Sequence, residues 1–108
     1  MKFIFHSDAG HGWLAVKAKL LQELNILDKV SEYSYISNSG KTVYLEEDSD
    51  MSRFINAFAP RHIKSAGLEP MTATQWCNEF IVSGYKPKHY SNVRNLRCFS
   101  PKLVNVKS

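Results

Sequence analysis

With 108 residues, of which 44% are hydrophobic and 22% charged, the chain has the size and composition of one globular domain spanning residues 1–108. This composition excludes disorder, whose signature is low hydrophobicity with high net charge. No apolar run approaches the about 20 residues that span a bilayer, so we expect no membrane contact. The run Phe3-Ile4-Phe5 is too short for a signal peptide, which favours a cytoplasmic location.

The net charge of +4 is unevenly distributed along the chain. Residues 1–59 hold six basic and eight acidic residues, a balance of −2, whereas residues 60–108 hold eight basic and two acidic residues, a balance of +6. Such asymmetry indicates two surfaces that attract oppositely charged partners.

The first elements in chain order are two short strands and a helix. Residues 2–6 and 13–16 have the composition of strands, and the Gly-containing segment 7–12 connects them. Val16, Leu20 and Leu24 recur at helical spacing, so a helix is expected from Lys17. Asn25 tolerates a left-handed backbone and is the expected end of that helix.

A β-hairpin is expected over residues 32–46. The runs 32–37 and 41–46 both alternate, and Asn38-Ser39-Gly40 between them is a turn sequence. The strands joined by this turn are expected to extend the sheet formed by the N-terminal strands.

A second helix is expected after the acidic run, with Asp48 or Ser49 as its cap and Pro60 as its end. The apolar residues of this segment share one helical face: Met51, Phe54, Ile55 and Phe58. Thr72 and Gln75 form a capping-box pattern that predicts a third helix, ending at Gly84. Its buried face would hold Trp76, Cys77, Phe80 and Ile81.

The C-terminal region gives weaker patterns. Residues 93–99 fit a strand or a short helix, and residues 100–108 fit a loose tail. These elements together predict an α+β fold, in which a small antiparallel sheet carries two to three helices on one face.

The segment 7–12 and its neighbours contain the densest polar cluster. His6, Asp8 and His11 suggest a metal site, and His11 alone suggests acid–base catalysis. The structural alternative, which we favour, is a strand connection in which Gly10 and Gly12 permit positive φ and Asp8 caps the turn.

The acidic run 46–50 has two interpretations. It lacks the spacing of a calcium loop, so we expect either a charged turn that suits the helix dipole or a surface for a basic partner. The candidate partner-binding residues are Glu46, Glu47, Asp48 and Asp50.

The basic C-terminal third suggests single-stranded nucleic acid, because aromatic residues alternate with basic ones. The candidate residues are Lys86, Lys88, Tyr90, Arg94 and Arg97. Arg94 and Arg97 are three apart and would face one way on a helix. The alternative is an ordinary solvated surface.

No catalytic residue and no cofactor is predicted. The chain has no Gly-x-Ser-x-Gly elbow and no Cys-x-x-Cys pair. Cys77 falls on a buried helical face, and in a reducing compartment Cys77 and Cys98 are expected to be free thiols.

Three segments carry a resemblance to a known group of proteins. The runs 6–16 (HSDAGHGWLAV), 33–35 (YSY) and 43–48 (VYLEED) resemble small hypothetical proteins encoded by phages, prophages and plasmids. The resemblance covers residues 3 to about 58, roughly half of the chain, and implies a mobile genetic element as the setting.

This setting favours a non-enzymatic protein that binds a host protein or defence complex in the bacterial cytoplasm, as an inhibitor of the anti-CRISPR or anti-restriction type. A nucleic-acid-binding module that uses the basic third is the first alternative. A metal-dependent enzyme at His6, Asp8 and His11 is the second.

Overall fold

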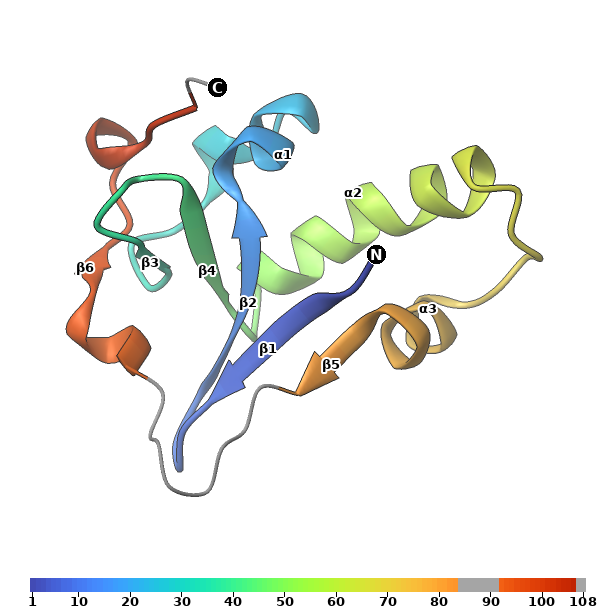
Figure 1. Cartoon of the computed structure of the whole chain (residues 1–108), viewed down its shortest axis with the longest axis horizontal. Helices are drawn as coiled ribbons and strands as arrows, with labels where there is room; N and C mark the ends of the chain where they lie inside the picture. The colour runs from blue at the N-terminus through green and yellow to red at the C-terminus, as the bar shows by residue number, and fades with distance from the viewer. Residues whose placement is uncertain (84–91, 107–108) are drawn as a thin grey trace.

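The computed structural model describes residues 1–83 and 92–106 as an α+β fold, which confirms the predicted class (Figure 1). Six strands form one sheet in the order β5-β1-β2-β4-β3-β6. Only the β1–β5 pair is parallel among the described strands. The strands are β1 (Phe3–Ser7), β2 (Gly12–Lys17), β3 (Tyr35–Ile36), β4 (Thr42–Glu46), β5 (Ile81–Ser83) and β6 (Arg97–Cys98). The helices are α1 (Ala18–Glu23), α2 (Asp50–Ser65) and α3 (Ala73–Phe80), with 3-10 turns η1 (Leu27–Lys29), η2 (Asn92–Asn95) and η3 (Pro101–Leu103).

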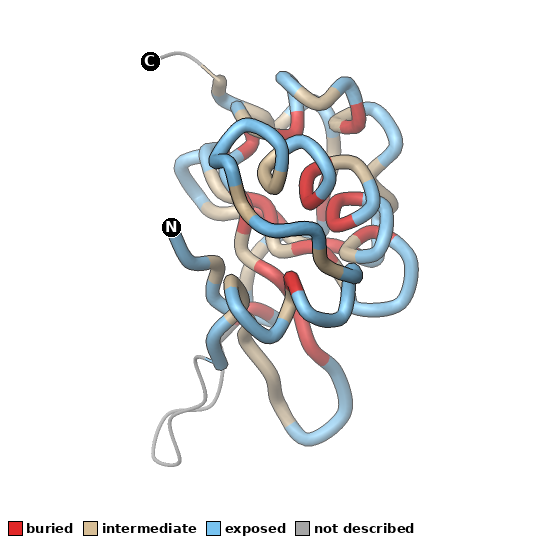
Figure 2. The backbone as a smooth tube through the Cα atoms, turned by 90° about the vertical axis from the view of Figure 1, so that its right-hand side faces the viewer, coloured by how far each residue is buried: buried red, intermediate tan, exposed pale blue. Residues whose placement is uncertain are grey.

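The helices cover one face of the sheet, where the core lies. The register places Leu14 opposite Leu45 and Val16 opposite Val43, and all four side chains are buried. Phe3 lies edge-on to Phe54 of α2, with ring centroids 5.3 Å apart. Figure 2 shows the buried stretches gathered in the middle of the molecule with exposed segments around them.

The opposite face of the sheet carries the alternate residues of the same strands. Trp13, Ala15 and Tyr44 lie there, and Tyr35 of β3 pairs with Tyr44 of β4. We call this face the open face. The residues that pack against the described helices point to the other side of the sheet.

The predicted hairpin is confirmed at its turn but is shorter than expected. Gly40 has φ of 76°, and its N–H bonds to Ser37 O at 2.9 Å. The first strand is only Tyr35–Ile36, because Ser34 turns inward and its hydroxyl bonds to Asp50. Asn25 follows α1 with φ of 58°, so the expected left-handed residue is confirmed.

Pro60 does not end the second helix, contrary to the prediction. α2 continues to Ser65 with Pro60 exposed inside it. The residues beyond the proline are held by packing: the His62 ring stacks on Phe58 at 5.3 Å, and its Nδ1 accepts the Trp76 Nε1–H at 3.0 Å. These contacts offset the one helical hydrogen bond that proline removes.

The third helix begins as predicted, since Thr72 and Gln75 form a complete capping box. It ends at Phe80 rather than at Gly84, which lies outside the described residues, because Ile81 enters β5 and pairs with Phe3. In residues 1–83 and 92–106, no helix has both the length and the apolar character that a membrane crossing requires.

The segment after Ser100, for which the sequence predicts a loose tail, is attached up to Val106. Leu103, Val104 and Val106 pack on the core, and the Asn105 N–H bonds to Gly40 O at 2.8 Å. The attachment therefore reaches the turn of the β3–β4 hairpin.

Candidate functional site

A cleft of about 660 Å³ lies on the open face of the sheet, and it joins several segments that the sequence analysis considered separately. Trp13 and Tyr35 form an aromatic pair in its lining, with ring centroids 5.8 Å apart and planes at 81°. The remaining lining residues are His11, Gly12, Glu32, Tyr33, Glu46, Glu47, Asp48, Ser49, Arg94 and Cys98. We call this site the acidic–aromatic cleft.

One wall of the cleft is built by Arg94 of η2. Its guanidinium forms an ion pair with Asp8, and its Cζ lies 5.3 Å from the centroid of the Trp13 ring. Two contacts thus join η2 to the β1–β2 loop and to strand β2, although Asp8 and Arg94 are far apart in the sequence.

Asp8 is a structural anion in this loop. Besides Arg94, its carboxylate accepts the N–H groups of Gly10 and His11, both at 2.9 Å. The Arg94 hydrogen bond and these two N–H groups hold the pKa of Asp8 well below its usual range. Asp8 therefore stays ionised at neutral pH and is unsuited to donate a proton.

The structure does not assemble the three predicted metal ligands. The His6 ring lies against Tyr44 with centroids 5.5 Å apart, and burial lowers the pKa of His6. His11 is exposed, with its ring 6.3 Å from that of Trp13, and Asp8 is engaged by Arg94. Within the described ranges, no three His, Cys, Asp or Glu side chains are grouped to hold an ion.

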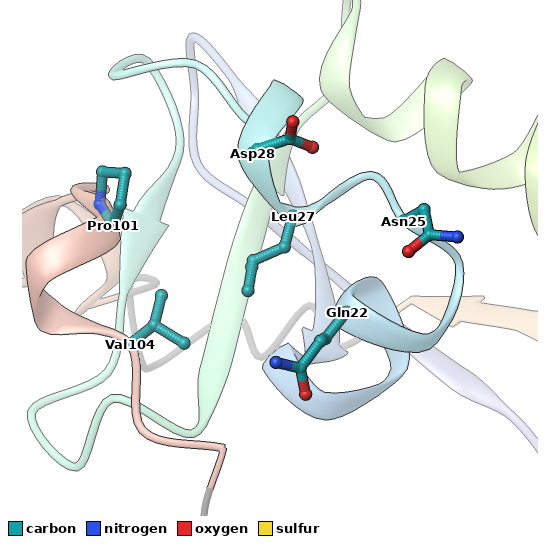
Figure 3. Close-up of a pocket in the computed structure, with 6 residues that line it drawn as sticks. All are labelled: Gln22, Asn25, Leu27, Asp28, Pro101 and Val104. Carbon is teal, nitrogen blue, oxygen red and sulfur yellow. The ribbon is translucent and has the colours of Figure 1, made fainter.

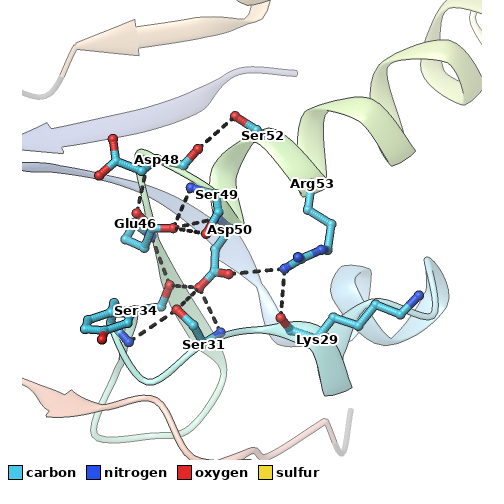
Figure 4. Close-up of polar contacts among 10 residues, drawn as sticks. Lys29, Ser31, Ser34, Glu46, Asp48, Ser49, Asp50, Ser52 and Arg53 are labelled. Atoms are coloured by element: carbon cyan, nitrogen blue, oxygen red, sulfur yellow. Dashed lines mark hydrogen bonds and ion pairs between the residues drawn. The ribbon is translucent and has the colours of Figure 1, made fainter.

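Asp50, predicted as a partner-binding residue, is instead buried, and this prediction is corrected. The residue is 3% exposed, and its carboxylate accepts the Ser31 N–H at 2.9 Å, the Ser31 hydroxyl at 2.7 Å and the Ser34 hydroxyl at 2.6 Å (Figure 4). Arg53 adds an ion pair at 3.3 Å. A partner cannot reach this carboxylate, because it is buried. Its hydrogen bonds join the start of helix α2 to the 31–34 loop.

Glu46 caps helix α2, whereas the sequence predicted Asp48 or Ser49 as the cap. Its carboxylate accepts the N–H groups of Ser49 at 2.6 Å, Asp50 at 2.7 Å and Asp48 at 2.7 Å. Although burial opposes ionisation, these N–H groups hold the pKa of Glu46 below its usual value. Ser49, the N-cap residue by position, makes no side-chain cap bond.

Glu47 and Asp48 are the members of the acidic run that remain exposed, and both line the cleft. Glu32 adds a third exposed carboxylate. No cation of residues 1–83 or 92–106 forms an ion pair with any of the three. They make the cleft acidic in a protein whose net charge is +4.

Tyr33 and Glu32 are functional candidates that the sequence reasoning missed. Tyr33 is 74% exposed, which is unusual for a large aromatic side chain. The flanking residues Ser31 and Ser34 both bond to Asp50, so the loop presents Tyr33 outward from a fixed base. The alternation of Tyr33 and Tyr35 was a usable signal, but it was attributed to a strand.

The candidate nucleic-acid residues are only partly described. Arg94 belongs to the cleft wall in η2, whereas Arg97 is exposed in β6, so the two do not share a helix as predicted. Lys86, Lys88 and Tyr90 lie outside the described residues.

A second hollow of about 450 Å³ lies between the α1–η1 segment and the C-terminal segment (Figure 3). Leu27 and Val104 point into it from opposite sides, with Asp28 at its edge. Its lining includes Gln22, Asn25 and Asp28 but no aromatic side chain among the described residues, and the acidic–aromatic cleft is the stronger candidate.

Both cysteines are free thiols, Cys77 half-buried and Cys98 exposed at the cleft. Burial raises the pKa of Cys77, which disfavours its nucleophilic thiolate.

No family model, curated protein or solved structure matches this chain.

Proposed function

We propose that this chain is a non-enzymatic binding protein of a phage or plasmid, which docks on a host protein through the acidic–aromatic cleft. Its resemblance to small proteins of mobile genetic elements supports the setting. In that setting it acts in the host cytoplasm, as an inhibitor of a defence complex of the CRISPR or restriction type.

The observation that carries the proposal is the exposed Tyr33 at the edge of a cleft lined by Trp13 and Tyr35. Aromatic side chains are enriched at the centres of protein interfaces, where they lose much solvent-accessible area at small cost in conformational entropy. A fixed loop base at Ser31 and Ser34 keeps that cost low for Tyr33.

The charges of the cleft favour a protein partner over nucleic acid at this surface. Phosphate groups would be repelled by the carboxylates of Glu32, Glu47 and Asp48, which no cation of residues 1–83 or 92–106 neutralises. A basic region of a protein, such as the nucleic-acid-binding groove of a defence complex, carries the opposite charge and is attracted.

The test is affinity capture from host lysate with the full chain, followed by identification of the captured protein and measurement of its binding. Tyr33→Ala is expected to weaken binding at least about tenfold, which corresponds to about 1.4 kcal/mol. Val82→Ala is the matched control, because Val82 is another exposed apolar residue, 41% exposed on β5. A partner that binds Tyr33→Ala as tightly as the unaltered protein contradicts the proposal.

A further inference from the structure

The acidic–aromatic cleft combines Trp13 with exposed carboxylates that form no ion pair within residues 1–83 and 92–106. Trp13 is 3% exposed and lines the cleft, and its indole N–H has no acceptor among the described residues. Every fully buried polar side-chain atom in this part of the chain has a partner, so the indole nitrogen of Trp13 keeps some solvent exposure. The other indole, that of Trp76, is satisfied by His62 at 3.0 Å.

Arg94 shows how this surface accommodates a guanidinium group. The side chain lies over the Trp13 ring at 5.3 Å and pairs with the Asp8 carboxylate. A guanidinium is planar, so it stacks on aromatic faces and forms paired hydrogen bonds with carboxylates, whereas an ammonium does neither as well. Elsewhere in the cleft, aromatic and acidic side chains again lie together, and no cation of the described residues forms an ion pair with these carboxylates.

We infer that the cleft recognises an arginine-bearing peptide segment of the partner protein. The guanidinium binds the carboxylates of Glu47 and Asp48 and contacts Tyr33 and Tyr35, while a backbone carbonyl of the segment accepts the Trp13 indole N–H. Charge complementarity selects this occupant, because the lining has Glu32, Glu46, Glu47 and Asp48, whereas Arg94 is the one Lys or Arg that residues 1–83 and 92–106 contribute to it, and Asp8 already neutralises Arg94. The inference rests on the proposed function and specifies the chemistry of the partner.

The test uses amide NMR spectra of the full ¹⁵N-labelled chain, in which each of the two tryptophans gives one indole N–H signal. A short Gly/Ser peptide that contains arginine is titrated to about 1 mM, a range that detects weak binding. The Trp13 signal, assigned with Trp13→Phe, is expected to shift on binding, whereas that of Trp76 stays in place.

Peptides in which citrulline, lysine or glutamate replaces arginine define the chemistry. Citrulline keeps the shape of arginine without its charge, and it is expected to bind at least about tenfold more weakly. Lysine is expected to be weaker than arginine, and glutamate is expected not to bind. Equal affinity for the citrulline or the lysine peptide overturns the assignment of a guanidinium, as does an unmoved Trp13 signal with the arginine peptide.

The double variant Glu47→Lys with Asp48→Lys reverses two exposed carboxylates and is expected to lose at least about tenfold in affinity. Glu23→Lys with Glu69→Lys is the matched control, since these exposed residues lie outside the cleft and the change in net charge is the same. An equal loss in both double variants overturns the inference.

The two proposals fail in different ways. If a captured partner depends on Tyr33 but arginine peptides do not bind, the inference about arginine fails and the docking function stands. If capture is also independent of Tyr33, both fail.

Discussion

The Ser34 hydroxyl donates to the Asp50 carboxylate at 2.6 Å, and its oxygen accepts the Glu46 N–H at 2.9 Å. One buried side chain therefore joins the loop before β3, the end of β4 and the first turn of α2. Since Glu46 caps the same helix, the loop that carries Tyr33 and the turn that carries Glu47 and Asp48 are held relative to each other. The 31–34 loop and the turn at Glu47 and Asp48, which form two edges of the cleft, are thus both held by the hydrogen bonds of Ser34 and Asp50.

Asp50→Ala is expected to destabilise the fold by about 3 kcal/mol, because it leaves the part-buried Ser31 donors and the buried Ser34 hydroxyl without their acceptor and breaks the ion pair with Arg53. Urea denaturation followed by circular dichroism measures the loss. Asp48→Ala, at an exposed position two residues away, should stay within about 0.5 kcal/mol of the unaltered protein. Equal stability of the two variants would mean that the Asp50 network contributes nothing.

Gly12→Ala is expected to cost about 1–3 kcal/mol through overpacking. A Cβ at Gly12 would overlap the ring of Phe5, which lies across the backbone of β2. The prediction that Gly12 provides a positive φ is wrong: in the described part of the chain, only Gly40 and Gly67 among the glycines have a positive φ. Close approach of an aromatic ring is the actual requirement.

Gly10→Ala is the control for this prediction, because a Cβ there meets only an Arg94 nitrogen at 3.5 Å and Asp8 Oδ1 at 3.9 Å, both ordinary contacts. Thermal unfolding should separate the two variants clearly. A Gly10→Ala protein that is as unstable as Gly12→Ala would point instead to a general intolerance of side chains in this loop.

The Asp8–Arg94 contact is expected to withstand mild acid. The pKa of Asp8 is lower in the folded chain than its ordinary value of 3.8. Its contribution to stability is therefore complete above pH 3.8 and is lost only as the pH falls through the lower folded-state value. Carboxyl ¹³C NMR titration should show Asp8 ionised below the range in which exposed aspartates protonate.

Arg94→Gln should raise the pKa of Asp8 toward 3.8, since the largest cause of the shift is removed while the N–H groups of Gly10 and His11 remain. If Asp8 titrates at the same pH with and without Arg94, the ion pair does not form in solution.

Local sequence patterns predicted the structural features that depend on interactions between residues close in sequence. The capping box at Thr72, the turn at Gly40 and the left-handed Asn25 follow from interactions within a few residues, and each is observed. Strand β5 was not predicted, and β6 lies within residues 93–99, for which the sequence left a strand and a short helix open. Both strands have partners that are distant in sequence: Ile81 pairs with Phe3, and Cys98 pairs with Tyr35. Pairing at such separation leaves no periodic signal in a run of two or three residues.

The site was predicted in fragments for the same reason. The His6–Gly12 segment, the acidic run and Arg94 were each identified as candidates, but their convergence around Trp13 depends on the Arg94–Asp8 pair and on sheet register. For Glu46 and Asp50 the sequence left a charged turn at the helix start and a partner-binding surface open, and neither interpretation predicts the burial of Asp50. The serine donors that bury Asp50 are 16 and 19 residues earlier in the chain.

The two thiols are expected to react at different rates with a disulfide reagent. Cys98 is exposed in β6, whereas Cys77 is half-buried and has a pKa raised by burial, which lowers its thiolate fraction. Cys98→Ser should abolish the fast phase of labelling, and Cys77→Ser should leave it intact. Because Cys98 lines the cleft, a bulky maleimide on it should also block the arginine peptide, and undiminished peptide binding by the labelled protein would place the binding site elsewhere.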